Sequence, residues 1–365
     1  MSTQTEPGRP RLDSIDVLRG LVMVVMAIDH VRDYFSGAHF DPTDLSQTTP
    51  AWFLTRFVTH YCAPVFVFLA GTGAYLGGTR GKTTKELSLF LLTRGLWLVL
   101  LELTVMRVAW SFDYDVHMLR AIVIWAIGWS MVVLAALVFL PRAAVLVFGL
   151  VLIAGHNAFD GVQGGTLWSI LHVQSMVEYA PGWHLFVFYP LVPWIGVMAA
   201  GYAFGAYAAG NRRRIRAIGL ACCALFVLVR FVNRYGDPAP WESQSSALFT
   251  LFSFLNCEKY PPSLDYLLMT LGPALVLLSV LPDTARGIAK VLVVFGRVPL
   301  FYYVLHVLLI HTLAVLLGGG GMGRGGYGLP AVYAVWAGVV ALLYWPCLKW
   351  MELKRRNKSA WLSYL

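Results

Sequence analysis

The sequence predicts an all-α polytopic membrane protein with about ten transmembrane helices, and three observations support this prediction. The chain of 365 residues is 58% hydrophobic and only 13% charged, which is about half the charged fraction of a soluble domain. Ten apolar segments are long enough, or nearly so, to bridge a hydrocarbon layer that needs about 20 helical residues. Basic residues gather at the ends of these segments on alternate sides, as the positive-inside rule expects.

The expected spans follow one another closely along the chain. We expect residues 1–13 to form a polar cytoplasmic tail, residues 14–350 a single transmembrane domain and residues 351–365 a basic cytoplasmic tail. The first span is too long and too interrupted by charge for a cleaved signal peptide, so we interpret it as retained. The ten segments lie roughly at 14–35, 51–77, 87–106, 118–140, 143–158, 185–209, 215–233, 264–281, 288–317 and 330–350.

The 28 lysines and arginines test this count independently. With a cytoplasmic N-terminus, 17 of them fall at inner segment ends, six at outer ends and five within spans. This bias favours an even number of crossings with both termini inside. It also accounts for the net charge of +9 without a nucleic-acid partner. The five cysteines show no CxxC and no metal-ligand spacing, so we expect neither a disulfide framework nor a metal.

The loops and glycines complete the expected organisation. Two outer segments are long, 157–184 and 234–263, and the second contains SALFTLFSFLN, which is too short to span and predicts a re-entrant or interfacial helix. The glycine-rich run 318–328 lacks the GK[ST] of a phosphate loop, so we expect a flexible outer turn. The GxxxG patterns at 73–77 and 201–205 predict close helix packing.

The first expected span carries the most informative polar residues. Arg19, Asp29 and His30 stand in the otherwise apolar run RGLVMVVMAIDH, and charged groups in bilayer hydrocarbon are costly and usually mark a pathway or a site. At about 100° per residue, Arg19 and His30 are three turns apart on one face, within ~20° in angle and ~16 Å in length. Asp33 continues that face, whereas Asp29 points away from it. One polar stripe therefore crosses most of the membrane.

Two neighbouring spans also contain charged residues. Arg56 and His60 form a second stripe at i, i+4 spacing. Arg94 and Glu102 lie eight residues apart in span three, within ~80° of each other. Structural ion pairs with neighbouring spans are the expected role of Arg56, Arg94 and Glu102, and contact with a ligand is the alternative for the two arginines.

Depth along the helices narrows the choice of histidines. At about 1.5 Å per residue, His30 and His306 lie roughly 25 Å from the inner end of their spans, and His60 lies ~13 Å from the outer end. We therefore expect that these three can meet in the outer half of the membrane, and which of them acts chemically stays open. No chemical role is expected for the histidines near loops, namely His39, His117, His156 and His172.

These residue types suit acyl transfer. An imidazole titrates near neutrality and can accept a proton from an amine or hydroxyl nucleophile, and Asp33 or Asp29 could orient the ring. Arg19, ~16 Å away, is too distant for that proton transfer, but it can hold the phosphates of a long cofactor such as acetyl- or another acyl-coenzyme A. Further candidate contacts for the coenzyme are Arg56, Arg94 and Lys259.

Several motifs carry a family resemblance over about residues 11–350. RLDSIDVLRGLVMVVMAIDH and APVFVFLAGTGAYL resemble the catalytic domain of the heparan-α-glucosaminide N-acetyltransferase family, and FGRVPLFYYVLH and KYPPSLDYLLMTLGP resemble its bacterial members. The spacing of Arg19 and His30 is similar to the R-x10-H pattern of membrane acyltransferase-3 proteins. The resemblance implies a multi-span acetyltransferase of the bacterial inner membrane, with both termini inside.

The same resemblance implies roles for residues. Acetyl would pass from cytosolic acetyl-coenzyme A to an amino sugar, glycan or small amine at the outer face, with His30 as the base and Arg19 on a coenzyme phosphate. The family's catalytic histidine aligns near residues 48–50, where this chain has no histidine. Either His30 takes that role or the chemistry differs.

Two other functional classes stay open. A transporter or flippase would explain polar groups at the midplane and a broken helix near Gly296 to Pro299. A haem-binding electron carrier would use histidines from several spans as axial ligands. The expected partners are membrane lipids, acyl-coenzyme A and the acceptor, and a homodimer is one assembly that we expect.

Overall fold

Helices make up most of the computed structural model, which describes residues 12–208, 210–318, 321–357, 359, 362 and 364. The expected N-terminal tail up to residue 11 and several residues of the basic tail lie outside this part of the chain. In chain order the helices are α1 (Asp13–Phe35), α2 (Pro50–Thr59), α3 (Cys62–Gly78), α4 (Thr84–Leu101), the π-helix η1 (Glu102–Met106), α5 (Arg107–Ser111), α6 (Val123–Leu137), α7 (Arg142–Gly155), the 3-10 helix η2 (His156–Phe159), α8 (Thr166–His172), α9 (Leu191–Ala208), α10 (Arg212–Val232), α11 (Ala247–Leu255), α12 (Leu264–Val280), α13 (Ile288–Arg297), α14 (Pro299–Leu316) and α15 (Leu329–Arg356).

The prediction of an all-α polytopic membrane protein is confirmed. Seven helical runs in the described chain are long and apolar enough to cross a membrane: Pro50–Gly78, Thr84–Ser111, Arg142–Phe159, Leu191–Ala208, Arg212–Val232, Pro299–Leu316 and Leu329–Arg356. α6 and α12 are shorter apolar helices, and α1 has 23 residues but contains the charged stripe. Each of the ten predicted segments therefore contains a helix, and α15 continues six residues beyond the predicted end of the domain.

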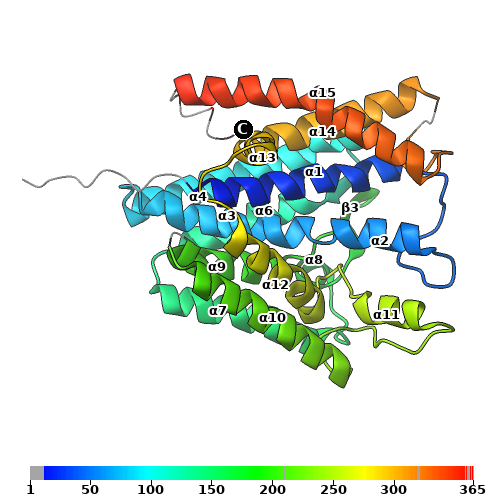
Figure 1. The fold of residues 1–365 in the computed structure, drawn as a ribbon, viewed down its shortest axis with the longest axis horizontal. Helices are drawn as coiled ribbons and strands as arrows, with labels where there is room; N and C mark the ends of the chain where they lie inside the picture. The colour runs from blue at the N-terminus through cyan, green and yellow to red at the C-terminus, as the bar shows by residue number, and fades with distance from the viewer. Residues whose placement is uncertain are drawn as a thin grey trace, which may run out of the picture.

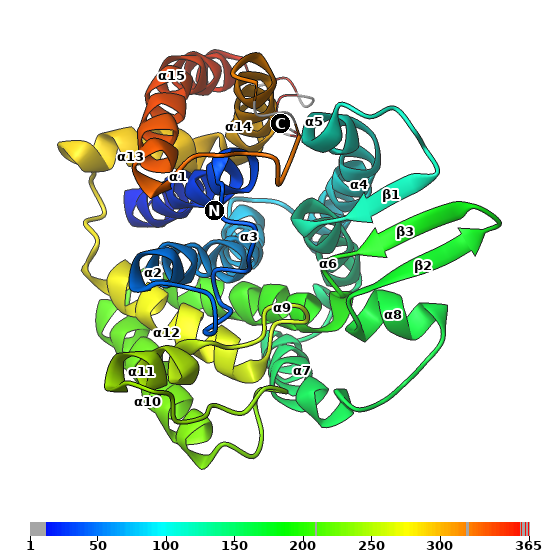
Figure 2. The ribbon, with the colours of Figure 1, turned by 90° about the vertical axis from the view of Figure 1, so that its right-hand side faces the viewer.

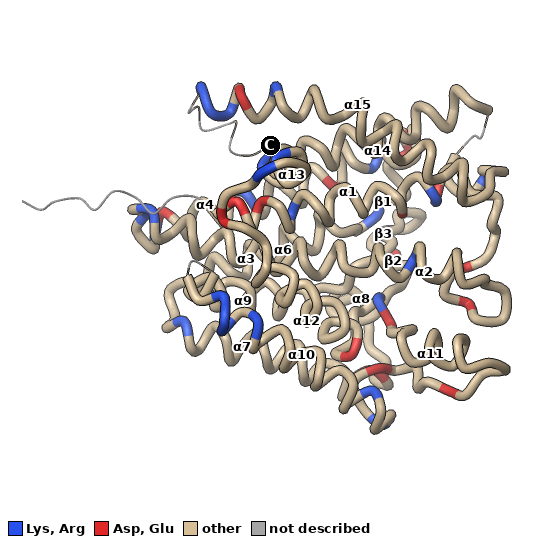
Figure 3. The backbone as a smooth tube through the Cα atoms, viewed as in Figure 1, with Lys and Arg blue, Asp and Glu red and all other residues tan. Residues whose placement is uncertain are grey.

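The two ends of the bundle differ in composition (Figure 1). At the end where α4 and α10 begin and α15 ends, which we call the basic end, Figure 3 shows lysines and arginines clustered on several helix termini. The opposite end, which we call the sheet end, carries α8, α11 and a small sheet. Figure 2 looks onto this end, with α1 and α3 in the middle, α13 to α15 on one side and α10 to α12 on the other.

The small sheet departs from the predicted helices. Its strands β1 (Met118–Ala121), β2 (Ser175–Ala180) and β3 (Trp183–Val187) lie in the order β1-β3-β2. β1 pairs in parallel with β3, with Met118 opposite His184, and β2 pairs antiparallel to β3. The predicted spans from 118 and from 185 thus begin as strands. Their hydropathy is compatible with either structure, and the pairing of β1 with β3 joins segments that are far apart in the chain.

Close approaches between helices centre on glycine. A Cβ at Gly20 of α1 would lie 1.9 Å from the carbonyl oxygen of Leu292 in α13, and one at Gly296 would lie 1.8 Å from that of Asp16. α3 and α9 meet in the same way at Gly71 and Gly201. Small residues let helix backbones approach closely in membranes. The α1–α13 contact fixes the helix turn that carries Arg19.

The predicted GxxxG packing holds for only one of the two motifs. Gly201 and Gly205 in α9 pack against Phe68 and Tyr75 of α3. For Gly73 and Gly77 the prediction is wrong. Among the residues that the structure describes, Arg19 Nη2 is the one atom within 4 Å of a Cβ at Gly73, and none lies within 4 Å of a Cβ at Gly77. Both glycines border a cavity.

Candidate active site

A cavity of about 540 Å³ lies inside the bundle and contains both ends of the predicted polar stripe, Arg19 and His30. Lys82 and Lys354 line it towards the basic end, and Lys259 lines it towards the sheet end. Helices α1, α3, α4, α6 and α14 supply most of its wall. Ligand pockets usually measure about 300–1,000 Å³, so the cavity is large enough for a cofactor.

His30 and His306 form a contacting pair at this cavity. Nδ1 of His30 lies 2.6 Å from Nε2 of His306, and the two rings stack with centroids 4.8 Å apart. His306 is fully buried and does not border the cavity, whereas His30 is partly exposed to it. Trp110 holds the other side of the His30 ring edge-on, with centroids 4.8 Å apart.

The hydrogen-bond network assigns the tautomers of the pair. Nδ1 of His306 lies 2.9 Å from the carbonyl oxygen of Tyr302, which can only accept a hydrogen bond, so this nitrogen carries the proton. Nε2 of a neutral His306 is then an acceptor, and Nδ1 of His30 donates to it. Nε2 of His30 is left with a lone pair, which is the state that a general base needs.

Asp29 and Asp33 belong to an ion-pair network beside the histidines. Asp29 pairs with Arg32 at 2.7 Å and with Arg56, and it accepts a hydrogen bond from Thr59 Oγ1 at 3.1 Å. Asp33 pairs with Arg32 at 2.9 Å. Both carboxylates border the cavity. In the described structure neither makes a hydrogen bond to His30, so the ring is oriented by His306 and not by a carboxylate as the sequence suggested.

Arg19 is held at the basic end by backbone and carboxylate groups. Its Nη1 donates to Asp16 at 3.3 Å and to the Gly296 carbonyl at 3.2 Å, and its Nη2 lies 3.5 Å from the Leu69 carbonyl. Arg297 joins the same cluster through Asp16, with Nε and Oδ2 3.1 Å apart. These contacts fix the guanidinium of Arg19 on the cavity wall without covering it, since Arg19 still borders the cavity.

Of the remaining predicted site residues, some border the cavity and others do not. Arg94 and Lys259 border the cavity, as a role in ligand binding requires. Arg56 does not, because its guanidinium is engaged by Asp29. His60 also lies off the cavity wall, with its ring packed against Tyr266 at 5.4 Å. The prediction that three histidines meet is therefore wrong for His60, which lies at the break between α2 and α3.

Residues 48–50 do not border the cavity. Glu102 has a structural role in place of the expected ion pair. It accepts backbone hydrogen bonds from Ile124 at 3.0 Å and Trp125 at 3.3 Å and thereby caps α6.

Several residues of the cavity wall were not predicted from the sequence. Lys82, Arg297 and Lys354 add positive charge towards the basic end, and Tyr260 and Tyr303 add hydroxyl groups. Burial alone raises the pKa of the Tyr260 hydroxyl, but the cations of Lys259 and Arg56 bring it below its ordinary value. The GRVP break at Arg297 was the one local signal, because a helix interrupted inside the membrane marks a site.

The glycine-rich turn borders the cavity on the side of Asp33. The described part of the turn is fixed: Gly323 donates its N–H to the Asp33 carbonyl at 2.7 Å, and Tyr327 donates to that of Phe35 at 2.9 Å. Met322 borders the cavity. Gly323 has φ of +76°, which favours glycine. The expected flexible turn is thus tied to the end of α1 at these positions.

The fold and the site define a class of protein: a polytopic membrane protein with an internal cavity that runs from a basic cluster to a histidine pair. A family model described as "Heparan-alpha-glucosaminide N-acetyltransferase, catalytic" matches residues 11–236, more than half of the chain. The chain belongs to this family, which implies a membrane acetyltransferase. A comparison with curated proteins finds no match. The matched range includes Arg19 and His30 and ends before His306, so it is shorter than the predicted resemblance.

Proposed function

We propose that the protein is a membrane acyltransferase that moves an acyl group, in the first place acetyl, from cytosolic acyl-coenzyme A to an amino sugar, glycan or small amine on the other side. The observation that carries the proposal is the single cavity shared by Arg19 and His30. The two residues are three helical turns, or ~16 Å, apart on α1. A coenzyme with anionic phosphates and a long, slim pantetheine arm has the shape to join them.

The charges of the cavity wall support one direction for the coenzyme. Basic side chains from four helices and the loop before α4 border its part towards the basic end, namely Arg19, Lys82, Arg94, Arg297 and Lys354. Arginine and lysine are the usual partners of phosphate groups. The bias of basic residues to this end favours a cytoplasmic position for it, with both termini inside. The resemblance to bacterial members of the family supports a place in the bacterial inner membrane.

The histidine pair supports the chemical step. Nε2 of His30 takes a proton from the acceptor amine while the amine nitrogen attacks the carbonyl carbon of the thioester. The C–N bond forms, the C–S bond breaks and the coenzyme thiolate receives the proton from His30. His306 holds the Nδ1 proton of His30 and so stabilises the imidazolium, the positioning role that a buried carboxylate has in serine hydrolases.

The test is turnover by purified protein. Wild type with acetyl-coenzyme A and glucosamine should release free coenzyme A and form the N-acetyl product, and the His30→Ala variant should lose about 10²–10⁴-fold in kcat. The matched control is His117→Ala, an exposed histidine at the sheet end. Normal turnover by the His30→Ala variant would exclude this mechanism. Flux of glucosamine into liposomes without an acyl donor would favour a transporter instead.

A further inference from the structure

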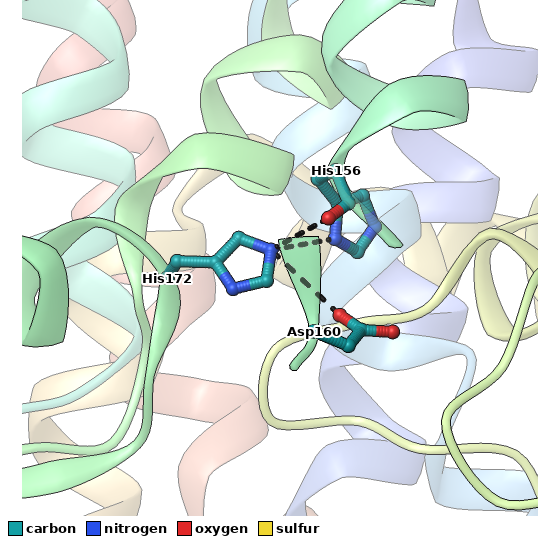
Figure 4. Close-up of side chains that lie close together, drawn as sticks. All are labelled: His156, Asp160 and His172. Carbon is teal, nitrogen blue, oxygen red and sulfur yellow. Dashed lines mark hydrogen bonds and ion pairs between the residues drawn. The ribbon is translucent and has the colours of Figure 1, made fainter. Parts of the chain in front are cut away.

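A second group of titratable side chains lies at the sheet end, apart from the cavity. His156 in η2, Asp160 just after it and His172 at the end of α8 point toward one another (Figure 4). Their potential ligand atoms all lie within 4.8 Å of one another. His156 and His172 are 3% and 2% exposed, and none of the three residues borders the cavity. The sequence predicted no chemical role for either histidine.

One ring nitrogen of this cluster lies near more hydrogen-bond acceptors than it can donate to. Nε2 of His172 lies 2.9 Å from the carbonyl oxygen of His156, 3.3 Å from Nδ1 of the same residue and 3.8 Å from Oδ1 of Asp160. A single N–H is donated well to only one of them. A cation at the centre would satisfy the ring nitrogen of His156 and the carboxylate of Asp160 together.

The spacing of the donors fits a tetrahedral metal ion. Two ligands at about 2.0–2.1 Å from Zn²⁺ are about 3.3 Å apart at the tetrahedral angle, which is the separation of His156 Nδ1 and His172 Nε2. Asp160 Oδ1 lies 3.8 Å from His172 Nε2 and needs to approach that nitrogen by about half an ångström to reach the same separation. Two imidazoles and one carboxylate form a donor set that suits Zn²⁺ and similar divalent transition metals.

The surroundings hold the donors in place. Asn157 Nδ2 donates to Oδ2 of Asp160 at 2.8 Å, which leaves Oδ1 toward His172, and Asn157 Oδ1 accepts from the Leu264 N–H at 2.9 Å. Trp168 stacks on the His172 ring with centroids 4.8 Å apart. Such supporting contacts orient metal ligands in known sites.

We propose that His156, His172 and Asp160 bind one divalent transition-metal ion, with Zn²⁺ as the best match, and that water completes its coordination. The ion binds through His156 Nδ1, His172 Nε2 and Asp160 Oδ1. On binding, His172 Nε2 gives up the hydrogen bond that it donates to the His156 carbonyl oxygen over 2.9 Å, and each neutral imidazole then carries its proton on the nitrogen that does not bind the ion. It ties the end of α7 and η2 to the end of α8. Since the ligands lie off the cavity, the site braces the sheet end and takes no part in acyl transfer.

The test uses full-length protein that has been treated with EDTA and then titrated with Zn²⁺ alone. Wild type should bind about one ion per chain and show a raised melting temperature, since a ligand that binds only the folded state stabilises it. His172→Gln and Asp160→Asn should each weaken binding by at least about tenfold and abolish the thermal shift. Co²⁺ should give visible absorption bands of a tetrahedral site in wild type and not in these two variants.

The matched control is His117→Gln. His117 Nδ1 lies 2.5 Å from Oδ1 of Asp115 in an exposed pair that has a histidine and a carboxylate but no second histidine. This variant should bind Zn²⁺ like wild type. Absence of stoichiometric binding by folded wild type would overturn the proposal, as would unchanged binding in both Asp160→Asn and His172→Gln, and would leave a hydrogen-bonded His–Asp pair. Neither readout depends on acyltransferase activity.

Discussion

Nδ1 of His30 donates a hydrogen bond to Nε2 of His306 over 2.6 Å, and the Tyr302 carbonyl fixes the second ring at 2.9 Å from its Nδ1. The pair joins α1 to α14, which lie at opposite ends of the sequence. It leaves one free lone pair, on Nε2 of His30, at the cavity wall. The arrangement predicts different roles for two histidines that the sequence could not rank.

Substitutions of His306 test whether this residue orients His30 or only packs against it. His306→Ala removes the acceptor for His30 Nδ1 and should lower kcat by about 10²-fold or more, with a smaller effect on KM. The His306→Gln side chain offers an amide oxygen as acceptor and should retain more of the activity. The measurement is steady-state kinetics at several pH values. Equal activity of the two variants across the pH range would contradict a positioning role.

Substitution of Arg19 should affect coenzyme binding. Arg19→Gln removes a positive charge from the cavity wall, so the KM for acetyl-coenzyme A should rise about tenfold or more, in line with a charge-assisted hydrogen bond of ~1.5–3 kcal/mol, and kcat should change less. The matched control is Arg213→Gln, an exposed arginine at the basic end. An unchanged KM in the Arg19→Gln variant would refute the phosphate role.

The open space at Gly73 should be required for the coenzyme. A methionine there would extend into the cavity beside Arg19, because that guanidinium is the one neighbour in the described part of the chain within 4 Å of a Cβ at this position. Gly73→Met should therefore reduce turnover by at least about tenfold without unfolding the helix, since glycine is the poorer helix former. The control Gly338→Met adds the same side chain on the exposed face of α15. If both variants turn over alike, the cavity is not the coenzyme path.

Arg230 should be a stability residue. It is 2% exposed and donates to the carbonyl oxygens of Ala239 at 2.9 Å and Asn256 at 2.8 Å, among others, and so joins α10 to the segment around α11. Arg230→Gln leaves buried acceptors without a donor and should cost about 3 kcal/mol, measured by chemical unfolding in detergent. The exposed Arg234→Gln should stay within ~0.5 kcal/mol of wild type. Similar stabilities would contradict this assignment.

The local sequence pattern was sufficient to predict the helices and the polar stripe on α1. Apolar segments about 20 residues long have few alternatives to a membrane helix, and the angular arithmetic that placed Arg19 and His30 on one face agrees with their common cavity. The His156–His172 contact was not predictable in this way, because it depends on how a loop returns to the end of α7.

The incorrect predictions concern residues whose neighbours come from other helices of the bundle. Arg56 and His60 have the same i, i+4 pattern as many site residues, but Asp29 engages one and Tyr266 covers the other. Gly73 and Gly77 match a packing motif, but among the described residues no helix packs against them. The contact between α3 and α9 uses Gly71 and Gly201 instead, and tertiary packing decides this. Periodicity gives the face of a helix but not the neighbour that meets it.

The most direct test of the central claim is a structure of the protein with a non-hydrolysable acetyl-coenzyme A analogue. We expect density along α1 inside the cavity, with the phosphates at Arg19 and the basic end and the carbonyl carbon of the acyl group near Nε2 of His30. Coenzyme bound outside the cavity, or with its phosphates at the sheet end, would contradict it.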